Sequence, residues 1–144
     1  MYSPSLELLP RTGTDGAPCE VDFVWIIPRA YPRKTVVIIG ECKDKGPITD
    51  GDIDNLKRIA DALPRKRFKT FVILSQLAPF TTEQIQYAKT LNDSYRSRVV
   101  LLTARELEPY FIYERTKAEK GVDGYGGEPE DMTMVTAQMY FKEE

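Results

Sequence analysis

Four charged residues at the ends of two apolar segments are the part of this sequence best suited to chemistry. Glu20 and Asp22 begin one segment, and Glu41 and Lys43 end the next. Side chains alternate between the faces of a strand, so the members of each pair share a face. Carboxylates suit a hard cation such as Mg²⁺, and a neighbouring lysine can orient or deprotonate a water or stabilise charge on a phosphate. The pattern predicts a divalent-metal site for phosphodiester hydrolysis.

These residues act together only if the two segments pair as an antiparallel hairpin. Residues 28–33 (PRAYPR) suit the loop, because proline cannot donate a hydrogen bond within a central ladder. The hairpin centre falls inside this loop if Asp22 lies opposite Glu41, and also if Glu20 does. Both registers gather three carboxylates and one ammonium on one face, whereas a slip of one residue separates them. The sequence leaves both registers open.

Cys42 stands between Glu41 and Lys43, and its backbone and side chain have different expected roles. Its carbonyl oxygen can reach a cation held by the two acids, so we expect Asp22, Glu41 and Cys42 to bind Mg²⁺, which Mn²⁺ could replace. Its thiol is expected to point to the opposite face, into the core, and to be inert.

The remaining sequence predicts the elements that hold the hairpin. Apolar β-branched segments indicate strands, and helical spacing with threonine-led capping boxes indicates helices. Strands are expected at 5–10, 20–28, 34–42, 68–75 and 98–102, and helices at 49–63, 81–91, from 103 onward, and at 132–144. We predict an α/β fold in which an antiparallel meander leads into parallel strands, giving a mixed sheet with helices on both faces. Residues 1–120 would form one domain, 121–131 a glycine-rich acidic loop, and 132–144 a C-terminal helix packed on the same domain.

Composition excludes several classes of function. The 144 residues allow one compact domain, and 42% hydrophobic with 29% charged residues is typical of globular proteins. The chain has no histidine, which rules out Ser-His-Asp, Cys-His and histidine-metal chemistry, and its two cysteines are too few for a disulfide framework. No apolar run approaches the roughly 18 residues of a membrane span, and no secretory signal opens the chain. We expect a cytoplasmic protein with no membrane partner.

Basic residues gather around the candidate site although the net charge is −2. Between Arg29 and Lys69, eleven Lys and Arg oppose six Asp and Glu. A phosphate-binding surface requires such an excess, although a solvated helix face explains some of these residues equally well. The candidates for nucleic-acid contact are Lys45, Lys57, Arg65, Lys66 and Arg67.

The motif and the order of elements together resemble a known family. Asp22, the triplet 41–43 (ECK) nineteen positions later, and the helix–strand–helix–strand that follows are similar to the PD-(D/E)xK, restriction-endonuclease-like nuclease superfamily. The resemblance covers roughly residues 5–102. Val21 stands where the motif has proline. The family core opens with a helix, so either the C-terminal helix replaces it here or the chain is a fragment of a longer protein.

The resemblance implies a Mg²⁺-dependent nuclease with the core of that fold. Asp22 and Glu41 would be metal ligands, Lys43 the catalytic lysine and Glu20 an auxiliary acid. The expected substrate is DNA, with endonuclease cleavage favoured over exonuclease cleavage, and other domains or subunits are expected partners. Two alternatives remain open. One is a catalytically silent module of this fold that binds nucleic acid or a partner protein, and the other is an unrelated α/β domain with a surface ion-pair network.

Overall fold

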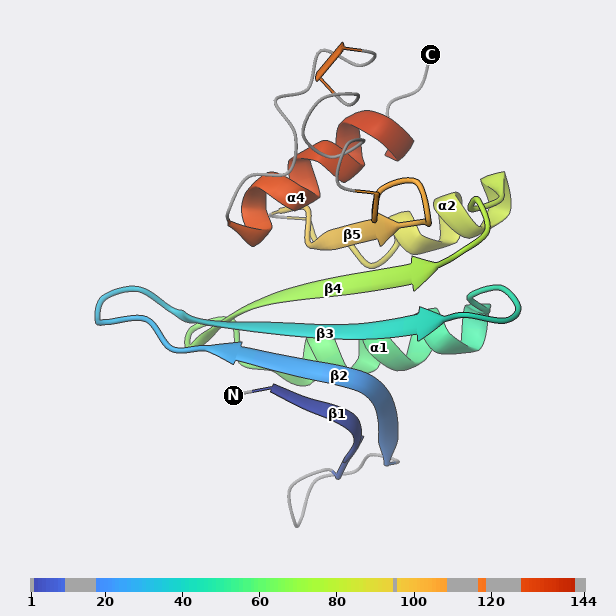
Figure 1. Cartoon of the computed structure of the whole chain (residues 1–144). Helices are drawn as coiled ribbons and strands as arrows, with labels where there is room; N and C mark the ends of the chain where they lie inside the picture. Colours follow the sequence, from blue (N-terminus) through green and yellow to red (C-terminus); the bar gives the residue numbers. More distant parts are fainter. Residues whose placement is uncertain (1, 10–17, 95, 109–116, 119–127, 142–144) are drawn as a thin grey trace.

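The computed structural model describes residues 2–9, 18–94, 96–108, 117–118 and 128–141, and its centre is a five-stranded sheet (Figure 1). The strands lie side by side in chain order: β1 (Tyr2–Leu8), β2 (Cys19–Ile27), β3 (Thr35–Lys43), β4 (Phe68–Gln76) and β5 (Val99–Leu102). β1, β2 and β3 pair antiparallel, and β3, β4 and β5 pair parallel. The structure therefore confirms the predicted α/β fold with a mixed sheet.

Two crossover helices connect the parallel strands and begin where the sequence predicts. These are α1 (Asp50–Ala62), between β3 and β4, and α2 (Thr82–Lys89), between β4 and β5. Thr49 and Asp52 form a capping box at the start of α1, and Thr81 and Gln84 form the equivalent box for α2. In each box two backbone N–H groups that the helix leaves unpaired find side-chain acceptors.

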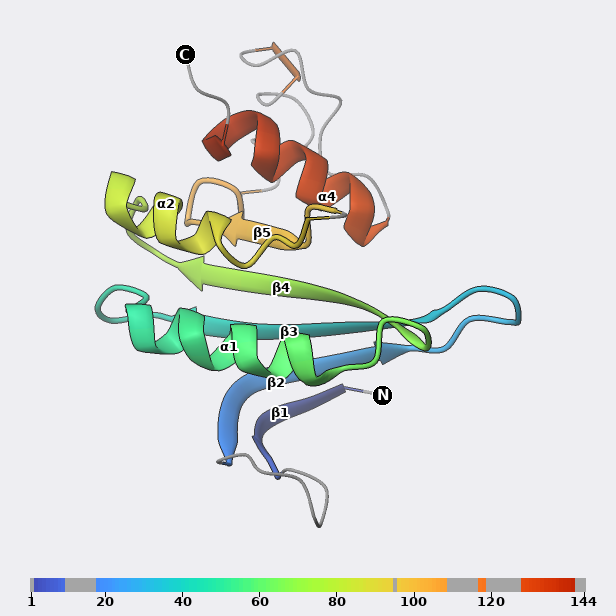
Figure 2. The ribbon, with the colours of Figure 1, turned by 180° about the vertical axis from the view of Figure 1, so that it is seen from behind.

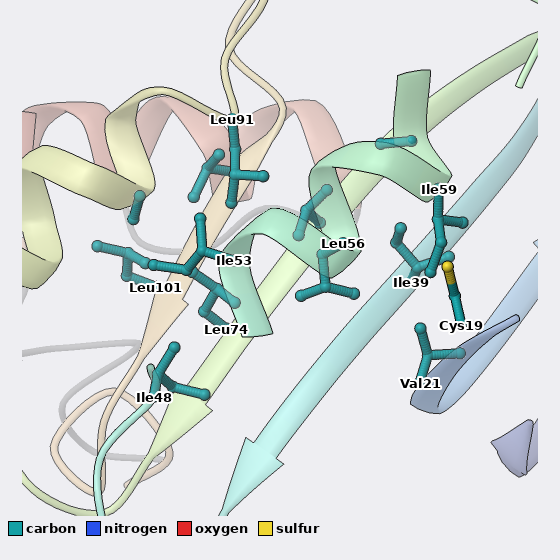
Figure 3. Close-up of a cluster of buried hydrophobic side chains, with 14 of the residues drawn as sticks. Cys19, Val21, Ile39, Ile48, Ile53, Leu56, Ile59, Leu74, Leu91 and Leu101 are labelled. Atoms are coloured by element: carbon teal, nitrogen blue, oxygen red, sulfur yellow. The ribbon is translucent and has the colours of Figure 1, made fainter. Parts of the chain in front are cut away.

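The main core lies between these two helices and one face of the sheet (Figures 2 and 3). Ile53 and Leu56 of α1 pack in one cluster with Ile39 of β3 and Leu74 of β4, and each is at most 1% exposed. The helical spacing of 53, 56, 59 and 60 places these side chains on one side of α1. The apolar strands β3 and β4 supply the opposing surface.

A smaller apolar cluster lies on the other face of the sheet. Val36, Ile38 and Phe71 are buried there, and Phe23, Ile27 and Ile73 pack against them; all six come from strands. Core packing is the default expectation for a tryptophan in an apolar strand, but Trp25, which pairs with Ile38, is 50% exposed. Among the described residues, the helices contribute to the first cluster and not to this one.

The C-terminal helix packs along the β5 edge of the sheet (Figures 1 and 2). It comprises α4 (Pro129–Thr136) and the π-helical turn η2 (Ala137–Phe141). The Thr136 hydroxyl accepts a hydrogen bond from the Leu101 backbone N–H at 3.2 Å, which satisfies a donor on the outermost strand. The helix begins three residues before the predicted position because Pro129 suits a first helical turn.

The helix predicted from residue 103 does not form within residues 103–108. The expected hydrogen bond from the Thr103 backbone N–H to Glu106 is present at 2.8 Å, but it closes a turn. Residues 109–116 and most of the expected glycine-rich loop at 121–131 lie outside the described residues. None of the helices in the described part of the chain combines the length and apolar character that a membrane crossing demands.

Candidate metal-dependent phosphodiesterase site

The register of the β2–β3 hairpin places Asp22 beside Glu41. Phe23 pairs with Gly40 and Val24 with Ile39, which is the first of the two registers that the sequence left open. Asp22 and Glu41 are the next residues along each strand. The Asp22 Oδ2 accepts a hydrogen bond from the Cys42 backbone N–H at 2.7 Å, so the Asp22 carboxylate crosses to the end of β3.

Lys43 lies between two carboxylates from different elements. Its Nζ donates to Glu41 Oε1 at 2.5 Å and lies 3.4 Å from Asp52 Oδ1. The Glu41 side chain is 12% exposed and the Lys43 side chain 29%, so the pair is partly shielded from water. These contacts require the charged ammonium, and they raise the pKa of Lys43 above its ordinary value, led by its hydrogen bond to Glu41.

The carboxylates also influence one another. Burial raises the pKa of Glu41, and the neighbouring charge of Asp22 raises it further, while the hydrogen bond from Lys43 acts in the opposite direction. The two acids are therefore close enough to repel. A bound cation would relieve this repulsion.

Asp52 joins this site through its contact with Lys43. Its Oδ2 accepts from the backbone N–H and the hydroxyl of Thr49, which forms the α1 cap, while its Oδ1 faces Lys43. The sequence places Asp52 at the mouth of the site, and helix capping is the role that it favours. Helix-start acids are common for capping and dipole reasons, so spacing alone cannot separate the two roles.

The loop between β3 and α1 brings Asp52 to Lys43. Gly46 adopts φ 83°, a left-handed conformation that glycine favours. Two glutamines then hold the next part of the loop, because the buried Gln76 accepts from the Ile48 N–H at 2.8 Å and Gln84 donates to the Ile48 carbonyl at 2.7 Å. The sequence predicted only the capping role of Gln84 and no role for Gln76, because their partners here are backbone atoms of a loop.

Within the part of the chain that the structure describes, no hydrogen bond or ion pair joins the Glu20 carboxylate to this cluster. The β2–β3 ladder stops at Phe23, and β2 curves away from β3 toward its beginning (Figure 1). Val21 and Val24 both enter the main core, which breaks the strict alternation that the prediction assumed. Glu20 is exposed. Its backbone carbonyl accepts a hydrogen bond from the Asn55 side chain at 2.6 Å.

The Cys42 thiol is not buried in the core, where the sequence analysis placed it. Cys42 is exposed and lines a largely apolar cleft of about 390 Å³ with Phe23, Ile73 and Ser75 among others. The expectation of an inert core thiol is wrong because no described helix covers this end of the second sheet face. Burial and then the charges of Asp22 and Glu41 raise the pKa of the thiol.

The residues at the end of the hairpin fit a hard, largely hydrated cation. Asp22 and Glu41 offer carboxylate oxygens, and the Cys42 carbonyl stands between Glu41 and Lys43 in the chain. Among the described residues, no group of three or more His, Cys, Asp or Glu side chains is arranged to hold a metal ion. Mg²⁺ commonly uses only one or two carboxylates with water and substrate oxygens, so this donor set suits it.

The candidate nucleic-acid contacts lie in two different places. Lys45 is exposed in the loop beside Lys43, and Lys57 is half-buried on α1. The exposed residues 65–67 precede β4, and Phe68 pairs with Thr35 at the opposite end of β3 from Glu41. Thr35 and Glu41 are six positions apart along β3, or about 20 Å at ~3.3 Å per residue.

Comparisons with known proteins add a likeness of fold only. No family model matches the chain, and no curated protein matches its sequence. The chain is similar to a solved structure described as the MspJI restriction endonuclease in complex with a 27-mer oligonucleotide, with 18% identity and a TM-score of 0.40. The match covers 96% of this chain and 27% of the other, so this chain spans about a quarter of that protein. A likeness at this level carries no argument about activity.

Proposed function

We propose that this chain is a Mg²⁺-dependent nuclease domain that hydrolyses phosphodiester bonds in DNA. The observation that supports this most is the set of contacts at the end of the β2–β3 hairpin. Asp22 and Glu41 lie together there, and the Lys43 ammonium lies 2.5 Å from Glu41 and 3.4 Å from Asp52. Two acids and a fixed cation at one strand end suit stabilisation of a phosphate that gains charge during attack.

Each residue has a distinct role in this proposal. Asp22, Glu41 and the Cys42 carbonyl would hold Mg²⁺, and Mn²⁺ could replace it. When bound, the ion would supply Lewis acidity and lower the pKa of an attacking water. Lys43 is held as a charged donor by its contacts with Glu41 and Asp52, which suits it to bind a phosphate oxygen or to orient that water.

Plasmid cleavage with matched variants tests the proposal. Supercoiled plasmid is incubated with the protein and Mg²⁺ or Mn²⁺, against a chelator, and products are separated on a gel. Lys43→Ala and Asp22→Asn should each lower the rate at least ~100-fold, the cost of losing one preorganised charge contact. Asp44→Asn is the control, because Asp44 is an exposed acid next to Lys43 in the chain. Endonuclease action predicts nicked and linear products before small fragments.

A catalytically silent module is the competing function. It is favoured by the finding that the described residues contain no group of three or more side chains arranged as metal ligands. Gel retardation of DNA with no metal-dependent cleavage would support the module. Cleavage that persists unchanged in Lys43→Ala would contradict the proposed active site.

A further inference from the structure

A second cleft with a strong positive charge lies at the far end of the sheet from the acid–lysine site. It has a volume of about 390 Å³ and is lined by Lys34, Arg65, Phe68, Asp93 and Arg96. These residues come from four separate parts of the chain: the end of the hairpin loop, the turn before β4, β4 itself, and the segment between α2 and β5. The tertiary fold therefore creates this cleft.

Three cations and a single carboxylate line the cleft. Arg65 and Arg96 each lie 3.8 Å from the same oxygen of Asp93, whose side chain is 7% exposed. Lys34 is the third cation. The lining side chains carry three positive charges and one negative charge at neutral pH, a net charge of about +2, so the cations repel one another. An anion from solution would reduce this repulsion.

Arg96 is held in place before any ligand arrives. Its guanidinium lies 5.6 Å from the centre of the Phe71 ring, and it donates a hydrogen bond to the Thr70 carbonyl at 3.4 Å. Burial lowers its pKa, and the like charges of Arg98 and Arg65 add to this effect, while the carboxylates of Asp93 and Glu130 oppose it. A positioned, crowded guanidinium suits recognition of a phosphate.

The positive surface continues out of the cleft. Arg33 precedes Lys34 in the hairpin loop, and Lys66 and Arg67 follow Arg65 in the turn; all three are exposed. A single small anion would contact only the cleft. A polyanion with regularly spaced phosphates would contact both the cleft and these flanking residues.

We propose that this cleft binds the phosphodiester backbone of a nucleic acid, away from the point of cleavage. The proposal rests on the proposed nuclease function, because it assigns a second contact to the same substrate. The cleft lies about 20 Å along β3 from Glu41, which corresponds to about six base pairs of duplex at ~3.4 Å per step. A substrate shorter than this cannot reach both places.

Binding measurements without cleavage test the proposal. Fluorescence anisotropy is recorded for a labelled 20-base-pair duplex with the Lys43→Ala protein in chelator, from 50 to 300 mM salt. The double variant Lys34→Ala/Arg65→Ala in the same background is compared with Lys34→Arg/Arg65→Lys, which keeps both charges. Both positions are exposed, and circular dichroism verifies that each protein is folded.

The expected result is a smaller salt dependence for the alanine pair alone. Each lost phosphate contact should reduce the slope of log K against log salt by about 0.9, so the pair should reduce it by about 1.8. Equal slopes for the alanine pair and its parent would overturn the proposal, as would the absence of any binding or an equal loss in the charge-keeping pair.

The same measurements separate this inference from the proposed activity. Binding that depends on Lys34 and Arg65, together with no metal-dependent cleavage by the wild-type protein, would support the cleft and reject the nuclease. Metal-dependent cleavage with unchanged slopes in the alanine pair would support the nuclease and reject the cleft. Inorganic phosphate added at constant ionic strength is a further arm. Phosphate that binds the parent but not the alanine pair at millimolar concentration, together with equal duplex slopes for the two proteins, would make the cleft a small-phosphate site and reject the backbone proposal.

Discussion

Replacement of Asp52 tests whether one carboxylate both caps α1 and contacts the candidate catalytic lysine. Its Oδ2 accepts from the backbone N–H and the hydroxyl of Thr49, each at 2.8 Å, and its Oδ1 lies 3.4 Å from Lys43. In Asp52→Ala both functions are lost. In Asp52→Asn the side-chain oxygen can still accept from Thr49, as the Gln84 amide does for Thr81 in α2 at 2.9 Å. The two variants therefore separate capping from charge.

The structure gives the expected size of each effect. Loss of a helix cap costs about 1 kcal/mol. The contact with Lys43 joins side chains that are 21% and 29% exposed, and a partly exposed pair contributes about 0.5 kcal/mol. We expect Asp52→Ala to lower the free energy of unfolding by about 1.5 kcal/mol and Asp52→Asn by about 0.5 kcal/mol or less. For a chain of this size the first value corresponds to a fall in Tm of roughly 4 °C.

Urea denaturation followed by circular dichroism at 222 nm measures both values. The pH dependence adds a second readout. Burial raises the pKa of Asp52, but the hydrogen bonds from Thr49 and the charge of Lys43 outweigh it, so the folded-state pKa is below the ordinary 3.8. The contribution of the carboxylate is then complete above pH 3.8 and is lost as the pH falls through the folded-state value. Equal destabilisation by alanine and asparagine would refute the capping assignment, and an unchanged Asp52→Ala protein would refute both roles.

Three further predictions concern other parts of the fold. Glu106 is fully buried and accepts hydrogen bonds from Thr103 and, at 2.8 Å, from the Tyr140 hydroxyl. Burial raises the pKa of Glu106, but these hydrogen bonds and the Arg105 guanidinium outweigh it, so the pKa lies below its ordinary value. Glu106→Gln should therefore lower the free energy of unfolding by about 2 kcal/mol at pH 7. In urea titrations this loss should become smaller below pH 4.5, and a difference that does not depend on pH would contradict the prediction. A thiol reagent should label the exposed Cys42 and spare the buried Cys19 in the native protein, which mass spectrometry of peptides detects; labelling of Cys19 first would contradict the β2 position. Gly40→Ala should cost about 2 kcal/mol, because its methyl group would lie 2.2 Å from the Phe23 ring, whereas an Ala30→Ser control should be neutral in the same denaturation assay.

The site around Lys43 depends partly on local sequence patterns and partly on the packing of distant elements. The alternation of apolar residues in β2 and β3, the proline-containing loop and the capping threonines are properties of short segments. Local conformational preferences and burial of one face suffice to specify such elements. The sequence therefore predicted the strand order, the two crossover helices and the meeting of Asp22 with Glu41, while leaving two registers open.

The sequence did not predict the contacts between distant segments. The bend in β2 depends on Val21 and Val24 both entering the core, and it leaves Glu20 exposed beside the cluster rather than in it. The exposure of Cys42 depends on which helices cover the second sheet face. The position of Asp52 near Lys43 depends on a loop held by two glutamines.

The amino-acid pattern by itself determined that two acids and a lysine meet at one end of a hairpin, because strand alternation fixes which side chains share a face. Only the tertiary structure decided which other charges join them. It added Asp52 to the acid–lysine cluster, and it gathered Lys34, Arg65 and Arg96 around Asp93 at the far end of the sheet. The physical reason is that these groups approach through the packing of separate elements, whose relative positions depend on the whole core.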